Sequence, residues 1–372
     1  MKRLKAVMVA ATAWAVIATA AIGAPGDCDR ACLRGTVDQL LASMVAHKPE
    51  ALPLADVYIA TENTHPAALG MMTAWTGITQ AGKPSLLALD PALGSAYFAL
   101  VVRESGSPAV LWGRIKVADR KISEVEIFEN RSRGDHGFSY SPEQLPTNYR
   151  KLMDVPAARK RASHEELVRL ARASFDADDP LPVAIANDCQ FTELGWKVID
   201  PGLDDVKAAP PPGAKPGEVH DPNAPLGCVF PPYRPTDKKA RIIAIDDELG
   251  FVVVAGVVPG HAYPYPHFGH MVSAFIPDQM REPAVAQDAW FARHVAKHAA
   301  PVVRPEPATS ETMQVLQYYD GKLQASQINV YLTGPGTRPI WLQPCNCRFF
   351  PTKADPTVVP AIQQVDTTLP AH

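Results

Sequence analysis

Two stretches of the chain are closely alike: LLALDPALGSAYFALVV at residues 86–102 and IIAIDDELGFVVVAGVV at residues 242–258. Aligned without gaps, they share seven identities in seventeen positions, and most other positions exchange one apolar residue for another. Asp90 of the first stretch matches Asp246 of the second. We therefore interpret the pair as an internal repeat, in which each copy contains two apolar strands joined by a turn.

A second match lies upstream of the first. ADVYIATEN (55–63) resembles ANDCQFTEL (186–194), at an offset of 131 residues instead of the 156 that separate Asp90 from Asp246. The second copy thus has 25 additional residues between its two matches. We assign them to residues 207–235, which are rich in Pro, Gly and Ala and lack periodicity, as expected of an exposed loop.

The elements around these matches complete each copy. Apolar residues at helical spacing predict amphipathic helices at residues 33–45 and 163–175, and Ser163-His164-Glu165-Glu166 is a capping box. A further strand pair closes each copy, at residues 109–129 and 313–332. The sequence therefore predicts an α+β fold of two tandem domains, each with helices packed on a curved antiparallel sheet.

Several short motifs run through both copies: C-x3-C, D-V-x4-E-N, D-C-x3-E, C-x2-P and R-x-I-x-I-D-x3-G. Their carriers are Cys28, Cys32, Asp56, Val57, Glu62, Asn63, Asp188, Cys189, Glu193, Cys228, Pro231, Arg241, Asp246 and Gly250. In this pattern the chain resembles a secreted two-repeat family of unknown function from fungi and bacteria. The order of elements is similar to the cone-shaped, SnoaL-like fold of nuclear transport factor 2-like proteins, which include ketosteroid isomerase, scytalone dehydratase and polyketide cyclases.

The resemblance covers roughly residues 28–332 and implies a fold but no reaction. One departure is that about 50 residues lie between Val258 and Met313, where the family has a short hairpin. We predict a first domain at residues 25–150, a second at 151–333 with insertions at 207–235 and 259–312, and a proline-rich tail at 334–372.

The composition is that of a globular protein. The 372 residues are 47% apolar and 20% charged, enough for two ordinary domains. The net charge of −3 gives no electrostatic reason to expect binding to nucleic acid or to an anionic membrane.

The first 24 residues have the form of a signal peptide. Three basic residues precede an uncharged apolar run at residues 6–22, which ends in small residues. The alternative is a membrane anchor, but the run is at the short limit for spanning. We predict cleavage, export to the periplasm or the cell exterior, and no membrane span in the mature chain.

Six cysteines in an exported chain indicate disulfides. The family resemblance implies a bridge between Cys189 and Cys228. Cys28 and Cys32 lie one helical turn apart and could bridge each other. Alternatively, each could reach the pair near the C-terminus, Cys345 and Cys347.

Glu62 and Glu193 occupy equivalent places, each after an apolar strand and a threonine. On a pocket wall, burial would shift the pKa of such a carboxyl toward neutrality and suit it to general acid–base catalysis. The alternative is a structural carboxylate that accepts backbone N–H groups, and recurrence in both copies favours it. For Asp90 and Asp246, followed by Gly94 and Gly250, we favour a turn over a catalytic role.

The segment GHAYPYPHFGHMV (260–272) lies in the insertion that departs from the family. Its histidines can transfer protons near neutral pH, and His267-x-x-His270 has a spacing that a metal could use. A proline-rich surface loop is the alternative, since Pro264 and Pro266 disfavour regular structure. Long ordered loops are often functional, so this segment is the first candidate site. The predicted ligand contacts are Tyr263, Tyr265, Trp196, His261 and His65.

We predict a cofactor-independent enzyme, without a metal, that acts on a small cyclic or aromatic molecule by proton transfer, as a lyase, hydratase or isomerase. Glu193 is the expected base and His267 or His270 the expected acid, with Glu62 as a further candidate. One alternative is a non-catalytic small-molecule-binding module whose domains pack through their sheets, and another is a structural envelope protein. No P-loop, G-x-G-x-x-G after a strand or G-x-S-x-G is present, so nucleotide use and serine hydrolysis lack support.

Overall fold

The computed structural model describes residues 27–132, 140–175, 181–197, 228, 230, 240–267, 270–278, 306–337 and 339–342. The predicted signal peptide and nearly all of the 207–235 insertion lie outside these residues. The predicted tail is described only as far as residue 342.

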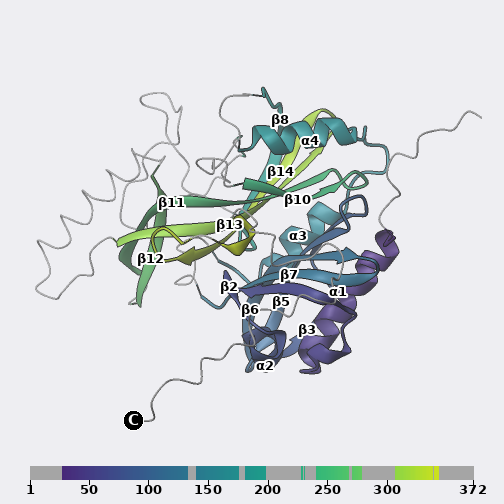
Figure 1. Cartoon of the computed structure of the whole chain (residues 1–372). Helices are drawn as coiled ribbons and strands as arrows, with labels where there is room; N and C mark the ends of the chain where they lie inside the picture. Colours follow the sequence, from purple (N-terminus) through teal and green to yellow (C-terminus); the bar gives the residue numbers. More distant parts are fainter. Residues whose placement is uncertain are drawn as a thin grey trace, which may run out of the picture.

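The described strands form two curled, seven-stranded sheets (Figure 1). The first contains β1 (Leu54–Glu62), β2 (His65–Pro66), β3 (Ile78–Ala81), β4 (Leu86–Asp90), β5 (Ser95–Glu104), β6 (Ser107–Ala118) and β7 (Lys121–Asn130). The second contains β8 (Ile185–Glu193), β9 (Trp196–Lys197), β10 (Ala240–Asp246), β11 (Phe251–His267), β12 (His270–Pro277), β13 (Glu306–Tyr319) and β14 (Lys322–Thr333). Two consecutive sheet domains were predicted, and the structure has them.

The two sheets have the same strand order. It is β2-β1-β7-β6-β5 in the first and β9-β8-β14-β13-β11 in the second, with β4 beside β5 and β10 beside β11. The quoted stretches are β4–β5 and β10–β11, where Asp90 pairs with Ser95 as Asp246 pairs with Phe251. Gly94 and Gly250 both have positive φ, of 62° and 71°. The repeated sequence therefore takes the same place in two matching sheets.

The sheets are mixed, so the prediction of antiparallel sheets is wrong in one respect. β1 runs parallel to β7, and β8 runs parallel to β14. After β1 the chain crosses to the far edge of the sheet and returns strand by strand through β5, β6 and β7. No hairpin connects β1 to β7, so nothing forces them to be antiparallel.

One helix lies on the outer side of each sheet (Figure 1). α1 (Arg30–Val45) buries Leu33 and Leu40 in one apolar cluster with Phe98 of β5. α4 (His164–Ala173) begins with the expected capping box and buries Leu167 in another cluster with Val252 of β11. The remaining short elements are η1 (Pro49–Ala51), η2 (Leu69–Met71), α2 (Thr73–Gly77), α3 (Leu145–Met153) and η4 (Ile340–Leu342).

A third apolar cluster joins the two sheets. Because strand side chains alternate between faces, Phe251 points away from the α4 side, which Val252 faces. Trp112 and Phe128 of the first sheet stack in this cluster, with ring centroids 4.1 Å apart, and Met313 of the second sheet joins them. The two domains are therefore packed through their sheets.

Asp90 and Asp246 form turns, as predicted, and also bond across the domains. Asp90 accepts the Leu93 N–H within its own turn at 2.9 Å. Its second oxygen accepts the N–H of Ile245 in the other domain at 2.8 Å, and Asp246 accepts the N–H of Leu89 at 2.9 Å. Asp90 thus accepts a hydrogen bond from β10, the strand that ends at Asp246. Asp246 accepts one from β4, the strand that ends at Asp90.

Replacing Asp246 with asparagine is expected to lower the free energy of unfolding by about 2–3 kcal/mol, because the buried carboxylate also pairs with Arg30 at 2.8 Å. Asp247→Asn is the matched control, since that side chain is 55% exposed, and its effect should stay within about 0.5 kcal/mol. Urea unfolding measures both. Equal effects would contradict the bonding across the domains.

The 260–272 segment is a strand hairpin, so the expectation that its prolines prevent regular structure is wrong. β11 pairs with β12 from Gly260 opposite Pro277 to His267 opposite His270. Within this hairpin Pro264 lies opposite Ser273, and Pro266 lies opposite Met271.

Two predicted disulfides are present. Cys189 bonds to Cys228, with Cα atoms 5.6 Å apart, and Cys28 bonds to Cys32, with Cα atoms 5.1 Å apart. The alternative in which Cys28 or Cys32 reaches the C-terminal pair is therefore wrong, and Cys345 and Cys347 lie outside the described residues. The two bridges fit an oxidising compartment. Of the helices described within residues 27–342, none is long and apolar enough to span a membrane.

Candidate functional site

Charged side chains lie between the two sheets. Side chains alternate between the two faces of a strand, and in β6, β7, β10 and β13 this alternation directs the charged ones toward the other domain. We call Arg114, Glu126, Arg241, Glu311 and Trp341 the interdomain cluster. Arg114 and Glu126 are directly opposite each other on neighbouring strands of the first domain. Arg241 enters from β10 and Glu311 from β13, so both domains contribute.

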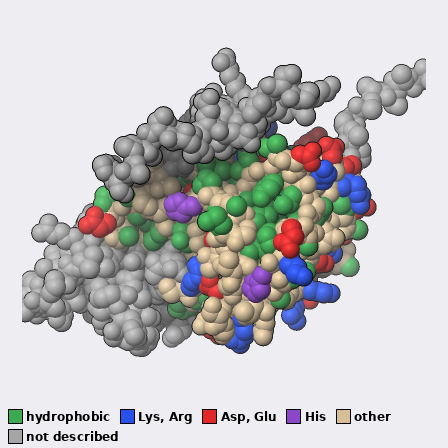
Figure 2. Space-filling model, turned by 60° about the horizontal axis from the view of Figure 1, so that its bottom comes forward, with side chains coloured by type: hydrophobic (Ala, Val, Ile, Leu, Met, Phe, Trp, Pro, Cys, Tyr) green, Lys and Arg blue, Asp and Glu red, His purple; other side chains and the backbone are tan. Residues whose placement is uncertain are grey.

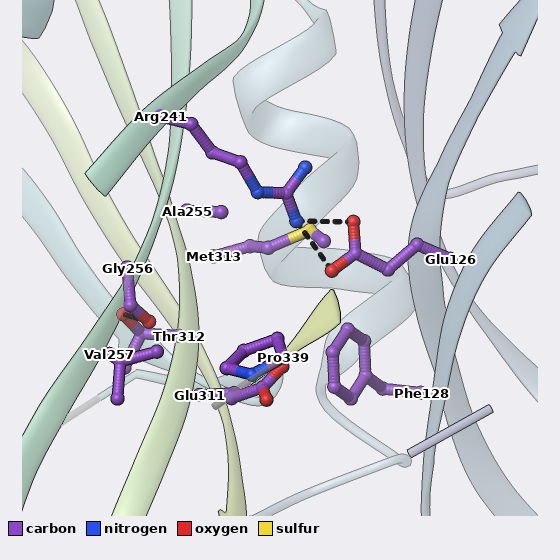
Figure 3. A pocket seen from close by; sticks show the side chains of 10 residues that line it. All are labelled: Glu126, Phe128, Arg241, Ala255, Gly256, Val257, Glu311, Thr312, Met313 and Pro339. Carbon is purple, nitrogen blue, oxygen red and sulfur yellow. Dashed lines mark hydrogen bonds and ion pairs between the residues drawn. The ribbon is translucent and has the colours of Figure 1, made fainter. Parts of the chain in front are cut away.

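Glu126 holds the two arginines together. Arg114 Nε lies 2.7 Å from Glu126 Oε2, and a terminal nitrogen of Arg241 bonds both carboxylate oxygens (Figure 3). Burial alone would raise the pKa of Glu126, but Arg241 and Arg114 outweigh it and lower that pKa. The carboxyl is therefore ionised and bonds both guanidinium groups.

The C-terminal segment covers this ion pair. The Trp341 ring lies under both guanidinium groups, with its centroid 4.5 Å from Arg114 Cζ and 5.6 Å from Arg241 Cζ. Its indole N–H donates to Thr61 Oγ1 at 3.0 Å. Cation–π contacts of this kind contribute about 0.5–2 kcal/mol each when desolvated, so they help to hold residues 339–342 in place.

Glu311 is buried and differs from Glu126 in its environment. Its side chain is on the face of β13 that meets the first domain, and the residue is only 4% exposed. Burial, reinforced by Glu126 and opposed by Arg241, raises the pKa of Glu311 to about 8. Its Oε1 has no hydrogen-bond partner, and neither does Arg241 Nε. Glu311 is therefore mainly a neutral acid at pH 7.

A small hollow of about 10 Å³ lies between these groups (Figure 3). Its lining residues are Glu126, Phe128, Arg241, Ala255, Gly256, Val257, Glu311, Thr312, Met313 and Pro339. It is smaller than the roughly 300–1,000 Å³ of sites for drug-sized ligands. It has room for about one water molecule or one polar atom of a ligand.

Glu62, a predicted catalytic residue, accepts backbone N–H groups in the structure. Its two carboxylate oxygens accept the N–H groups of Thr73 and Ala74, each at 2.8 Å, at the start of α2. This geometry favours the structural alternative. Near it, burial raises the pKa of Glu129 to about 8, with Arg131 opposing the shift.

Glu193 is buried at the end of β8, with Trp196 opposite it in β9. The register places Glu193 beside Ile328, which faces α4, and Ile328 beside Gln314. Gln314 Nε2 and Ser326 Oγ are buried without a hydrogen-bond partner. Glu193 therefore shares its face with polar groups.

The predicted histidines are spread over the molecule. His65 is exposed in β2, opposite Glu62, and His261 bonds Asp278 at 3.2 Å. His267 and His270 face each other at the end of the β11–β12 hairpin, and three strands separate β12 from β8. Their side chains, and those of Tyr263 and Tyr265, lie outside the description. In the strand order, the hairpin that carries His267 and His270 is therefore not a direct neighbour of β8.

Figure 2 shows one face of the molecule, on which acidic and basic side chains are interspersed. Among the described residues of this face, charges of one sign do not form a patch. Within the described residues, no group of three His, Cys, Asp or Glu side chains is placed to hold a metal ion.

No protein-family model matches the chain, and no curated protein is significantly similar to it in sequence. The resemblance to a secreted two-repeat family therefore stays a prediction, and function must be argued from the site.

The interdomain cluster was missed in the sequence, although a signal for it exists. In SEVEIFE (123–129), Val125 and Ile127 alternate with Glu124, Glu126 and Phe128. Residues two apart in a strand point to the same face, so Glu126 and Phe128 share one face. A face that carries both charged and aromatic residues indicates packing against something other than the domain's own helix. Nothing in the sequence indicated that Arg241 would meet that face.

Proposed function

We propose that the protein is an exported, non-catalytic module of two cone-shaped domains, and that it binds a small molecule whose polar end enters the hollow between its sheets. The interior between α1 and the first sheet is filled, since Leu40, Trp75 and Phe98 are all essentially inaccessible there. At these positions side chains fill the space between α1 and the sheet, which supports a non-catalytic role for this part of the domain.

One observation carries the proposal: Glu311 faces the hollow with an oxygen that has no hydrogen-bond partner. An unsatisfied buried polar atom costs about 1–3 kcal/mol, and such atoms in native proteins call for an explanation. A bound molecule that completes the hydrogen bond supplies one. Export to the periplasm or cell exterior is supported by the two disulfides and by the form of residues 1–24.

Crystals of the mature chain soaked with a panel of small amides, carboxylic acids, phenols and amines test the binding function. We expect a member of the panel to place a polar group in the hollow, within reach of Glu311. Glu311→Leu, which removes the polar group at similar size, should leave the hollow empty under the same conditions. Occupancy elsewhere only, or unchanged occupancy in Glu311→Leu, would contradict the proposal.

A second candidate is the proton-transfer enzyme, with its site in the second domain. Positions of β6–β7 and β13–β14 correspond at an offset of 201 residues, so Gln314 and Ser326 replace Gly113 and Val125. Polar groups on the α4-facing side of the second sheet, beside Glu193, favour this alternative. Ligand density between Glu193 and Gln314 in the same soaks would support it, as would activity that is lost in Glu193→Gln and in the His267→Ala, His270→Ala double variant.

A further inference from the structure

We propose that the ring of Trp341 occupies a site for a planar aromatic molecule that carries an N–H or O–H donor on its edge. Such a molecule would displace the C-terminal strap, which we define as residues 339–342, and rest against the guanidinium groups of Arg114 and Arg241. This inference rests on the proposed binding function. It adds the chemical class of the ligand and the element that closes its site.

Trp341 is held by contacts that an aromatic ligand can also make. Its ring lies against one guanidinium group from each domain, with its centroid 4.5 Å from Arg114 Cζ and 5.6 Å from Arg241 Cζ. Its Nε1–H donates to Thr61 Oγ1 at 3.0 Å. The residue is only partly buried, whereas Trp112 of the core between the sheets is inaccessible. A paired cationic surface with one acceptor beside it therefore favours a ring with a donor on its edge.

The two guanidinium groups offer faces rather than free charge. Arg114 bonds Glu124 at 2.5 Å and Glu126 at 2.7 Å, and Arg241 bonds Glu126 as well. The N–H groups of a guanidinium lie in its plane, so these carboxylates bind its edges and leave its faces to stack on a ring. A ligand in this place needs an aromatic face and no charge of its own.

The turn before the strap has the features of a hinge. Residues 334–337 connect β14 to the strap, and Gly336 has a positive φ of 73°. A Cβ added at Gly336 would have no atom within 4 Å, so the turn is not packed there. The Gly336 N–H bonds Thr309 Oγ1 at 3.0 Å, which fixes the turn to β13. Glycine tolerates large changes of φ, so the strap can swing from an attached turn.

The strap also closes the hollow. Pro339 is buried and lines the hollow together with Arg241 (Figure 3). With the strap in place the hollow has room for about one water molecule. Arg241 contacts both the hollow and the Trp341 ring, so the two spaces become continuous when the strap moves. A ligand ring in the place of Trp341 would thus direct a polar substituent toward the hollow.

Titration of the mature chain with indole tests this inference, and 1-methylindole is the matched probe with the same ring and no N–H. In the wild type we expect saturable binding that shifts the ¹H–¹⁵N signal of the Trp341 side chain, assigned by its loss in Trp341→Phe. Trp341→Ala removes the competing ring and should bind indole about tenfold to a hundredfold more tightly than the wild type. That variant should prefer indole to 1-methylindole by at least about threefold, and adding Thr61→Val should abolish the preference.

Two further variants control for folding and for the position of the change. Trp341→Phe keeps a ring but loses the N–H, so it should bind indole at least about threefold more tightly than the wild type even if Trp341→Ala does not fold. Ile340→Ala alters the neighbouring residue of the same short helix and should bind within about threefold of the wild type. A Trp341 signal that does not move in the wild type, at about a hundredfold the indole concentration that half-saturates Trp341→Ala, would overturn the inference. Equal affinities in the wild type and Trp341→Ala would also overturn it.

Glu311→Leu separates this inference from the binding function, since it changes the hollow and leaves the contacts of Trp341 intact. Indole that displaces Trp341 equally in the wild type and in Glu311→Leu would support the ring site. A soaked molecule that places a polar group in the hollow while Trp341 stays against Arg114 would overturn this inference and leave the binding function standing. Displacement of Trp341 by indole, with no member of the panel reaching the hollow, would support the ring site and contradict the binding function.

Discussion

Replacing Glu126 with glutamine is expected to lower the free energy of unfolding by about 3–5 kcal/mol. Glu126 is the carboxylate that Arg114 and Arg241 share, and its side chain is only 2% exposed. Removing the charge from a buried ion pair leaves its partners uncompensated, which costs more than the pair itself contributes. Glutamine keeps the shape, so the loss measures charge rather than packing.

Two comparisons make this result specific. Glu124→Gln removes a neighbouring carboxylate that is 26% exposed and pairs with the same Arg114, and it should cost at most about 1 kcal/mol. Adding Arg241→Met to Glu126→Gln should recover part of the loss, because one unpaired charge disappears. A cost below 1 kcal/mol for Glu126→Gln in chemical denaturation would show that the cluster is solvated rather than buried between the domains.

The second large effect is a loss of stability as the pH rises from about 5 to 8. Burial raises the pKa values of Glu311 and Glu129 from 4.5 to about 8. In this window both groups hold a proton in the folded state and not in the unfolded state, so folding binds protons and stability falls with pH. Each group contributes a slope of up to about 1.4 kcal/mol per pH unit.

Single variants separate the two groups. Glu311→Gln and Glu129→Gln should each flatten the profile by about one group's share, and the double variant should be nearly flat between pH 5 and 8. Glu306→Gln, at an exposed position of β13, should leave the slope unchanged. Below pH 4.5 the lowered pKa of Glu126 acts in the opposite sense, and stability should fall again as the pH drops. A flat wild-type profile from pH 5 to 8 would count against buried, protonated carboxyls.

Much of the fold could be predicted because local patterns control it. The apolar alternation around Asp90 and Asp246 marks two strands, and the glycine four residues later closes a turn at positive φ. An added Cβ at Gly250 would lie 2.4 Å from the carbonyl oxygen of Tyr318. The capping box at Ser163 and the bridge from Cys189 to Cys228 are likewise local or paired signals.

The candidate site could not be predicted, because it arises where the two copies meet. Arg241 and Glu126 are 115 residues apart, and only the packing of the sheets makes them partners. Asp246 was predicted only as a turn residue. The same packing lets its carboxylate accept a hydrogen bond from the N–H of Leu89 in the other domain. Recurrence favoured a structural role for Glu62, which was nevertheless kept as a catalytic candidate, and the backbone N–H groups that it accepts agree with the structural role.

The proposed binding function requires that Glu311 is enclosed between the two sheets in its neutral form. The most direct measurement is a ¹³C NMR titration of the side-chain carboxyl groups in protein labelled on glutamate, with Glu311→Gln used to assign the signal. We expect a carboxyl that titrates near pH 8 and is absent from the variant. A Glu311 signal that titrates near pH 4.5 would contradict the enclosed site.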